Sequence, residues 1–217
     1  MRNLKRTLSL ALASVMLVGM MSVGASAVNA SDFTDADEIV NKDAVSTMTA
    51  LGIINGKEDG SYFDPTGTVT RAEMAKMLCV AINGGVDPVL GVKDTPTFTD
   101  IKGHWAESYI EYCAANGIIA GRGNNKFDPT GTVSATEAAK MLLGVLGYNA
   151  EKSGLVGNDW AINTNVLANQ NGLYKNLANL NANTLLTRDN AAQMIYNALD
   201  ANMVELNAAG NYTTSQY

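Results

Sequence analysis

One hexapeptide occurs twice in this chain, and it belongs to a longer pattern that repeats three times. Residues 64–69, Asp-Pro-Thr-Gly-Thr-Val, return unchanged as residues 128–133. Phe33 and Phe98 each stand nineteen residues before a glycine, and Trp105 and Trp160 each stand twelve residues before one. A period of roughly fifty to sixty residues is typical of a modular array, whose units bury their apolar faces against one another. We therefore expect a chain that binds an extended partner rather than one that carries out chemistry.

The first thirty residues have the pattern of a secretory signal peptide. Arg2, Lys5 and Arg6 precede an apolar run over residues 8–23, and residues 25–27, Ala-Ser-Ala, form a small-residue cleavage site. We expect residues 1–30 to be removed on export and leave them out of the fold. No later run is apolar and long enough for a membrane-spanning helix, so we expect no membrane span in the exported chain.

The net charge limits the kind of partner. The full chain carries a net charge of −6. Removal of the leader's three basic residues leaves twelve basic and twenty-one acidic residues, a net charge of about −9. An acidic surface argues against nucleic acid and against anionic lipid as partners. An anionic ligand would have to be held locally by a few well-placed cationic side chains.

The cysteines and the histidine are too few for a metal centre. Cys79 and Cys113 are the only cysteines and His104 is the only histidine, whereas a zinc site takes four protein ligands, or three and a water molecule held together in one site. Both cysteines occupy apolar positions of the repeat, which favours two buried thiols, and export leaves a disulfide between them as the alternative. Residues 57–61 lack the ligand spacing of an EF-hand. We predict no metal and no cofactor.

The exported chain divides into three repeats and a tail. We place the repeats at residues 31–83, 97–149 and 154–203, which together form a domain of residues 31–203, and the tail at residues 204–217. The first helix of each repeat is expected to end at Gly52, Gly117 or Gly172, since glycine suits the left-handed residue that closes a helix. A loop and a second helix follow. The tail lacks an apolar stripe, so we expect it to fray or to lead toward another domain.

The second helix of each repeat has the clearest signal. Apolar residues recur at offsets of three, four, seven and eight from Met74, Ala138 and Ala191, which is one face of an α-helix. A capping pair precedes each stripe and predicts where the helix begins. These pairs are Thr70 with Glu73, Ser134 with Glu137 and, in weaker form, Thr187 with Asn190.

Helices of this length cannot bury their apolar faces alone, but three pairs can share one core. We therefore predict an all-α fold in which three helix–loop–helix repeats pack with approximate threefold symmetry around a central helical bundle. Short strands near residues 53–54 or Phe63 are compatible with this fold but not required by it. Because a proline follows Asp64 and Asp128, both aspartates are expected to be extended.

Two arginines are the best candidates for a ligand contact. Arg71 and Arg188 occupy the first helical position after their capping threonines, where partial positive charge already disfavours a cation. A guanidinium beside unpaired helix-start amides is a good anion site. The alternative is an internal ion pair, for instance with Asp35 or Glu73. The second repeat has Ala135 at this position, so a site there would be weakened.

The tryptophans, the histidine and two glycines of the repeats each allow more than one interpretation. Trp105 and Trp160 open the first helices of the second and third repeats, and each either fills the core or offers a flat face to a sugar ring. His104 is expected to cap or pack. Gly56 and Gly121 mark places where the backbone turns or approaches a neighbour, with closeness to a ligand as the lesser alternative.

These motifs, in this order, resemble the S-layer homology (SLH) domain, present as three tandem motifs. Each full motif runs Phe-x-Asp, Trp, a helix to Gly-Ile-Ile-x-Gly, Phe-Asp-Pro and Thr-Arg-Ala-Glu. The first repeat has all of these except the tryptophan, which is replaced by Val40. The second repeat has the other elements, but its last one is altered to Ser134-Ala135-Thr136-Glu137, without the arginine. The third keeps the tryptophan, Gly172 and Thr187-Arg188, and lacks Phe-x-Asp.

The resemblance implies a pseudo-threefold helical fold with grooves between motifs, and non-covalent attachment of exported proteins to the bacterial cell wall. It implies a secondary cell wall polysaccharide, often pyruvylated, or peptidoglycan as the ligand. The predicted binding residues are Arg71, Arg188, Thr70, Glu73, Trp105, Trp160, Asp35, Asp100, Gly56 and Gly121. Because the repeats differ at these positions, one or two working sites are expected.

Two other functions remain open. The chain could be a subunit of a surface lattice that contacts further copies of itself, or a secreted glycan hydrolase. Acidic residues are numerous, but none recurs as a pair in an apolar cleft pattern, so we predict no catalytic residues and no enzyme.

Overall fold

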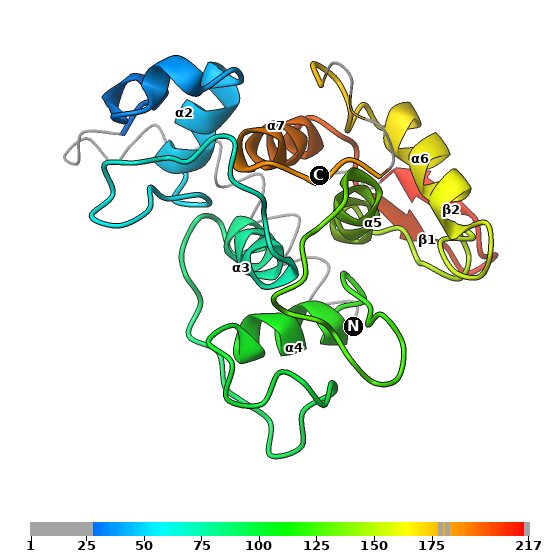
Figure 1. Ribbon diagram of the computed structural model, residues 1–217. Coiled ribbons are helices and arrows are strands. Elements are labelled where there is room, and N and C mark those ends of the chain that lie inside the picture. The colour runs from blue at the N-terminus through cyan, green and yellow to red at the C-terminus, as the bar shows by residue number, and fades with distance from the viewer. Residues whose placement is uncertain (1–27, 178–179, 181–182, 215–217) are drawn as a thin grey trace.

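Six α-helices form within residues 28–177, 180 and 183–214, which are the residues that the computed structural model describes (Figure 1). They are α2 (Lys42–Ala50), α3 (Arg71–Ile82), α4 (Glu107–Ala115), α5 (Ala135–Val145), α6 (Trp160–Gln170) and α7 (Arg188–Leu199), with 3-10 turns η1 (Ala30–Asp32) and η2 (Ala36–Glu38) and strands β1 (Val204–Leu206) and β2 (Tyr212–Thr214). The all-α prediction is confirmed. Residues 53–54 and Phe63 lie in turns and loops instead of strands. Residues 1–27 of the predicted signal peptide lie outside the described residues.

The second helices begin where their capping pairs predict. Thr70 Oγ1 accepts a hydrogen bond from the Glu73 amide, and the Glu73 carboxylate accepts one from the Thr70 amide at 2.7 Å. Ser134 and Glu137 repeat this capping box ahead of α5. Thr187 caps α7 with its hydroxyl alone. These local bonds satisfy amides that a helix start otherwise leaves unpaired.

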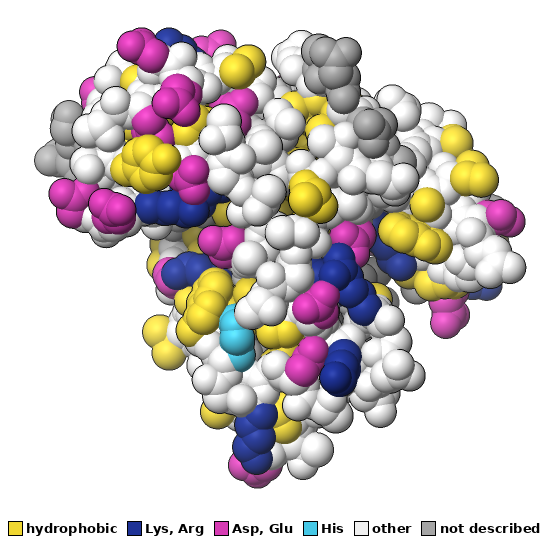
Figure 2. Space-filling view, in the orientation of Figure 1, with side chains coloured by type: hydrophobic (Ala, Val, Ile, Leu, Met, Phe, Trp, Pro, Cys, Tyr) yellow, Lys and Arg dark blue, Asp and Glu magenta, His cyan; other side chains and the backbone are white. Residues whose placement is uncertain are grey.

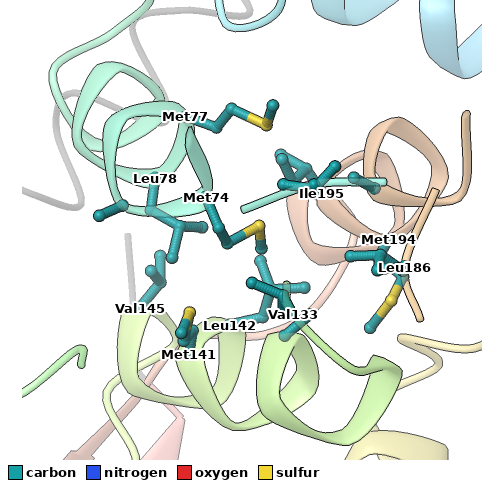
Figure 3. Packing of buried hydrophobic residues seen from close by; sticks show 14 of the residues in the cluster. Met74, Met77, Leu78, Val133, Met141, Leu142, Val145, Leu186, Met194 and Ile195 are labelled. Atoms are coloured by element: carbon teal, nitrogen blue, oxygen red, sulfur yellow. The ribbon is translucent and has the colours of Figure 1, made fainter. Parts of the chain in front are cut away.

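The second helices also form the central bundle. Figure 1 shows α3, α5 and α7 in the middle of the molecule and α2, α4 and α6 around them. Side chains from the three central helices point into one shared core, among them Met74, Leu142 and Ile195 (Figure 3). All three are fully or almost fully buried. The three apolar stripes found in the sequence therefore meet in space, while the approximate threefold symmetry of the repeats stays a prediction.

A closed ring of three backbone hydrogen bonds joins the repeats at the starts of the central helices. The Val69 amide donates to Leu186, the Leu186 amide to Val133, and the Val133 amide to Val69, at 2.8–2.9 Å. Each of these residues directly precedes a capping residue and is fully buried. The ring fixes the three helix starts relative to one another, so the repeats can fold only as a set.

The first helices pack between repeats rather than as separate pairs within them. Helix α4 of the second repeat packs on α3 of the first, and α6 of the third packs on α5 of the second. Helix α2 of the first repeat closes the circle on α7 of the third. A helix pair therefore combines two sequence repeats, and no repeat buries its apolar stripe without its neighbours.

The tail does not fray up to residue 214, which corrects the sequence-based expectation. Strands β1 and β2 form an antiparallel hairpin, with Val204 opposite Thr214. The Val204 amide donates to Leu146 at the end of α5, and the Tyr212 ring packs on Tyr148 with centroids 5.1 Å apart. These few contacts anchor the hairpin, and strands of three residues are too short to leave an alternating pattern.

Cys79 and Cys113 are free thiols, both fully buried where α3 meets α4. The Cys113 thiol donates to the Ala75 carbonyl oxygen at 3.5 Å. This agrees with the buried-thiol interpretation. None of the described helices is long and apolar enough to cross a membrane.

Thr164 gives a first stability prediction. Its hydroxyl is buried against α5 and has no hydrogen-bond partner within the described part of the chain. An unsatisfied buried hydroxyl costs about 1–3 kcal/mol, so Thr164→Val should raise the free energy of unfolding by about 1 kcal/mol. Thr136→Val is the matched control, because the buried Thr136 hydroxyl bonds to Asn165 at 3.2 Å and its loss should destabilise. Urea unfolding of the two variants checks the prediction, and a loss of stability in Thr164→Val would contradict it.

Candidate functional site

Arg71 lies at the start of α3 but points into the loop of the second repeat. Its Nε donates to the Phe127 carbonyl oxygen and its Nη2 to the Ala120 carbonyl oxygen, both at 2.7 Å. The guanidinium stacks over the Phe127 ring, 4.4 Å from the centroid. Only 3% of the residue is exposed. We call this arrangement, with Asp100, Asp128 and Glu137 around it, the Arg71 junction.

Arg188 repeats the arrangement at the start of α7, against the loop of the first repeat. Its Nε donates to the Phe63 carbonyl oxygen at 2.7 Å and its Nη2 to Asn55 at 2.8 Å. The guanidinium lies 5.0 Å from the Phe63 ring centroid, and 5% of the residue is exposed. We call this arrangement, with Asp35, Asp64 and Glu73 around it, the Arg188 junction. The same construction therefore occurs twice, each time between two repeats.

The helix-start amides beside these arginines are not exposed, contrary to the sequence-based expectation. The Arg71 amide donates to Gly131 at 2.8 Å, and the Arg188 amide donates to Gly67 at 2.9 Å. Their acceptors belong to the Asp-Pro-Thr-Gly turns of the neighbouring repeat. The duplicated turn is thus a cap for the next helix, and an anion at these junctions would have to be bound by side chains.

Neither arginine pairs with the acids that the sequence suggested for it. Among the described residues, the carboxylate nearest to Arg71 is Glu137 of the next repeat, with 3.4 Å between Nη1 and Oε1. Asp35 instead accepts from the amides of Phe63 and Asp64, at 2.9 and 2.7 Å. Asp100 does the same for the loop of the second repeat. Both aspartates position loops, and whether they also line a ligand site stays a prediction.

These hydrogen bonds hold the backbone of Asp64 and Asp128 in the left-handed region, with φ of 61° and 62°. The prediction of an extended conformation for the two aspartates was therefore wrong. Proline disfavours the right-handed helical region for the preceding residue, and aspartate tolerates the left-handed one better than most residues. Hydrogen bonds to Asp35 and Asp100, which lie about thirty positions upstream, decide between the remaining backbone conformations. Strained backbone of this kind gathers at functional sites.

A charge network surrounds the Arg71 junction. Burial lowers the pKa of Arg71 to about 10, although Glu137 opposes the shift, and the group stays charged at neutral pH. Arg122 donates to Asp128 and from two nitrogens to Glu137. Burial alone would raise the pKa of Glu137, but the Ser134 amide and Arg122 outweigh it and the pKa is lowered. On the face shown in Figure 2, basic side chains lie in small groups beside acidic ones.

The shifted pKa values of three carboxyl groups predict how the stability of the fold depends on pH. The pKa values of Asp64, Asp100 and Glu137 are lowered in the folded chain from 3.8, 3.8 and 4.5. Groups of this kind stabilise the fold above their unfolded pKa, and the stabilisation is lost as the pH falls through the folded pKa. The melting temperature should therefore be flat near neutral pH and fall below about pH 4.5. Asp189, whose pKa is raised by burial, acts in the opposite direction.

Thermal unfolding across pH 7 to about pH 2 checks this prediction. Glu137→Gln keeps an acceptor for the helix cap but cannot ionise, so its melting temperature should fall less steeply with acid. An unchanged acid slope in this variant would show that Glu137 does not contribute.

The two tryptophans have different environments. Trp105 lies in the turn before α4 and is 55% exposed, which excludes the core-filling interpretation for it. Its ring lies 6.4 Å from Tyr109. Trp160 begins α6 and is partly buried, with Lys140 Nζ 5.2 Å from its ring centroid. His104 packs beside Trp105, with ring centroids 5.5 Å apart, and its Nδ1 accepts from the Ala106 amide at 3.1 Å in the turn before α4, which has no side-chain cap.

Gly56 and Gly121 are required by close backbone approach. A Cβ atom at Gly56 would lie 2.3 Å from the Gly60 carbonyl oxygen, and one at Gly121 would lie 2.6 Å from that of Lys126. The approach is to the chain's own loop. Among the described residues, no cluster of three or more His, Cys, Asp or Glu side chains could hold a metal ion.

The remaining junction, between the second helix of the second repeat and the loop of the third, has no arginine. Ala135 takes the place of the arginine, and its amide donates to Thr184 at 2.9 Å. Residues 178–179 and 181–182 of the facing loop lie outside the described residues. The nearby side chains are Thr136, Asn165 and Tyr174, whose hydroxyl donates to Asn165 at 2.6 Å. The structure therefore supports two arginine junctions rather than three equal ones.

Sequence reasoning missed two exposed cations. Lys57 and Arg122 follow Gly56 and Gly121 directly, and their side chains are 38% and 37% exposed. The repeat itself could have identified them, because a basic residue follows the glycine in both loops although the next residues, 58–62 and 123–126, differ. Each pairs with the left-handed aspartate of its own loop.

An apolar cavity of about 20 Å³ lies at the other end of the bundle, among the last turns of the central helices. Its lining comprises Leu78, Ala81, Ile82, Leu142, Val145, Leu146, Ile195, Ala198, Leu199 and Met203. This volume is close to the minimum that holds one water molecule, and an apolar lining offers water no partner. The cavity is a packing defect rather than part of the junctions.

Two of the three repeats are similar to a known domain family. Residues 32–75 and 97–139 match the S-layer homology domain family. The chain is 28% identical over 207 residues to a cell surface protein of Thermoanaerobacter kivui, a match that covers 94% of this chain and 26% of that protein. It is 32% identical over 111 residues to an S-layer protein of Bacillus licheniformis, covering 51% of this chain and 12% of that protein.

A third relative has an enzyme name. Exoglucanase XynX of Acetivibrio thermocellus is 28% identical over 156 residues, which cover 67% of this chain and 14% of the enzyme. In all three cases the chain spans about a quarter or less of the relative's length.

Proposed function

We propose that this chain, which carries two S-layer homology segments, is a non-catalytic module that attaches an exported protein to the bacterial cell wall. Its ligand is an anionic secondary cell wall polysaccharide, with peptidoglycan as the other candidate. The observation that carries the proposal is the duplicated junction. A cationic side chain is held in a fixed place between two repeats at Arg71 and again at Arg188.

The junctions suit an anion because internal bonds already engage their carboxylates. Asp35 and Asp100 accept backbone amides, and Glu73 is bonded within its capping box. Thr70 and Glu73 thus shape the Arg188 junction, and the exposed Trp105 offers a flat apolar face near the start of α4. We propose Arg188 and Trp105 as the main contacts, and Arg71 and Trp160 as weaker ones.

The names of the relatives support a cell-surface role. Two are a cell surface protein and an S-layer protein. The exoglucanase matches over only 14% of its own length, which fits a shared attachment module separate from the catalytic part. We propose that the third repeat, which contains α6 and α7, is a third and divergent motif of the same family.

Cosedimentation with purified bacterial cell walls tests this function. The chain should pellet with walls at low salt and be released as salt increases, because contacts to a polyanion are screened. The protein alone is the control for sedimentation. Failure of the folded chain to pellet with walls that carry an anionic polymer would refute the proposal.

Assembly into a surface lattice is the second candidate. One observation favours it: Val86, Val89 and Val92 are exposed on the segment between the first two repeats. Exposed apolar runs often mark contacts between proteins. Sheets or higher oligomers that form as the concentration of pure protein rises, without wall material, would support this role.

A further inference from the structure

The two arginine junctions differ in how many of their cationic donors are free. The difference begins with Lys57 and Arg122, which occupy equivalent places in the two loops. Both side chains are a little over one-third exposed, and both pair with the left-handed aspartate that precedes a proline. They differ in what else they bind.

Arg122 is almost fully engaged by its own repeat. Its Nε and Nη2 donate to Glu137 Oε1 at 3.1 and 2.7 Å, and Nη2 also donates to the Thr132 carbonyl oxygen at 3.0 Å. Its Nη1 donates to Asp128. Arg122 therefore joins the loop to α5 and uses four of its five N–H donors.

Lys57 is largely free. An ammonium group has three donors, and within the described part of the chain the Lys57 ammonium bonds only to Asp64. Two donors remain for solvent or a ligand. Removing an exposed pair of this kind costs the fold little, about 0–1 kcal/mol.

The two buried arginines show the same difference, because among the described residues Arg188 has more free donors than Arg71. Arg71 Nη1 lies 3.4 Å from the Glu137 carboxylate. For Arg188 Nη1, no hydrogen bond or ion pair to another described residue is present. Asp64 lies close to both cations of this junction, since its pKa is lowered first by the hydrogen bond from Lys57 and also by the charge of Arg188.

From these contacts we propose that the Arg188 junction is the open anion site, that Lys57 is its ligand-contacting cation, and that Arg122 closes the Arg71 junction. The ligand class is a carboxylate- or phosphate-bearing glycan. This inference rests on the proposed wall-binding function and names the site that carries it.

Long-range charge favours the opposite choice. The charge of Lys126 helps to lower the pKa of Asp100, and Lys140 lies near Arg71 and Glu137. The Arg71 junction therefore has more positive charge around it than the Arg188 junction. Charges separated by about 10 Å are largely screened at physiological salt. Free donors at hydrogen-bond distance act directly on the ligand and are short, charge-assisted contacts. We therefore give the free donors more weight than the field.

Matched single variants test the choice between junctions. Lys57→Gln should weaken cosedimentation with purified cell walls by about tenfold, the loss expected when one charge-assisted contact is removed. Lys57→Arg should restore binding. Arg122→Gln removes the equivalent cation from the other loop and should bind within about threefold of the unmodified chain. Melting temperatures verify that each variant is folded.

Two results would overturn the inference. One is wall binding by Lys57→Gln equal to that of the unmodified chain. The other is a loss in Arg122→Gln as large as that in Lys57→Gln, and Arg122→Lys repeats this measurement if the glutamine variant is unfolded. If the unmodified chain itself fails to pellet with walls, the proposed function fails instead, so the two failures are distinguishable.

Discussion

Arg188→Met is expected to lower the free energy of unfolding by about 3 kcal/mol, because the carbonyl oxygens of Phe63 and Asn55 lose their donors. Each buried acceptor left without a partner costs about 1–3 kcal/mol. Methionine fills much of the same volume, so the loss measures the hydrogen bonds rather than a cavity. Arg71→Met removes the bonds to Phe127 and Ala120 and should cost a similar amount.

Urea unfolding measures both losses. Arg188→Lys is the control, because it keeps the positive charge but cannot reproduce the planar fork that reaches two carbonyl groups. It should be intermediate in stability between the unmodified chain and Arg188→Met. A loss below about 1 kcal/mol in both methionine variants would show that the buried guanidiniums do not hold the loops.

Phe127→Ala should have the larger effect, a loss of about 4 kcal/mol. The ring is fully buried, packs on Phe98 with centroids 5.5 Å apart, and lies under the Arg71 guanidinium. Its removal leaves a cavity and withdraws the surface on which Arg71 rests. Phe63→Ala makes the same change in the first repeat and should have a comparable cost, since Phe63 packs on Phe33 and Arg188.

Phe127→Leu is the control that retains most of the apolar volume, and it should lose less than half as much stability as Phe127→Ala. Thermal or urea unfolding gives the comparison. A cost below about 2 kcal/mol for Phe127→Ala would indicate that the loop can collapse around the gap, contrary to a rigid junction.

The sequence predicted well those features that local residues determine. The starts of α3 and α5 follow from capping boxes formed within four residues, and both boxes are present. The left-handed glycines Gly52, Gly117 and Gly172 have φ near 70° as expected. The apolar stripes of the second helices meet in the core. The caps and the glycines depend on residues close together in the chain, and the stripes can be recognised from their local helical spacing.

Features that depend on distant residues were missed. The backbone of Asp64 is decided by Asp35, and the place of Arg71 by carbonyl groups of the next repeat. Position at a helix start identified the two arginines as candidates for a ligand contact, a role that stays a prediction. It could not reveal that they are buried, because the turn that covers them comes from another repeat. The pairing of helices across repeats was hidden for the same reason.

We propose that cations at the repeat junctions recognise a negatively charged wall polymer. Binding of the folded chain to purified walls should be measured before and after acid extraction of the secondary polymer. We expect the chain to pellet with intact walls and to stay in solution with extracted ones. Equal binding to both would contradict this proposal and would identify peptidoglycan as the ligand.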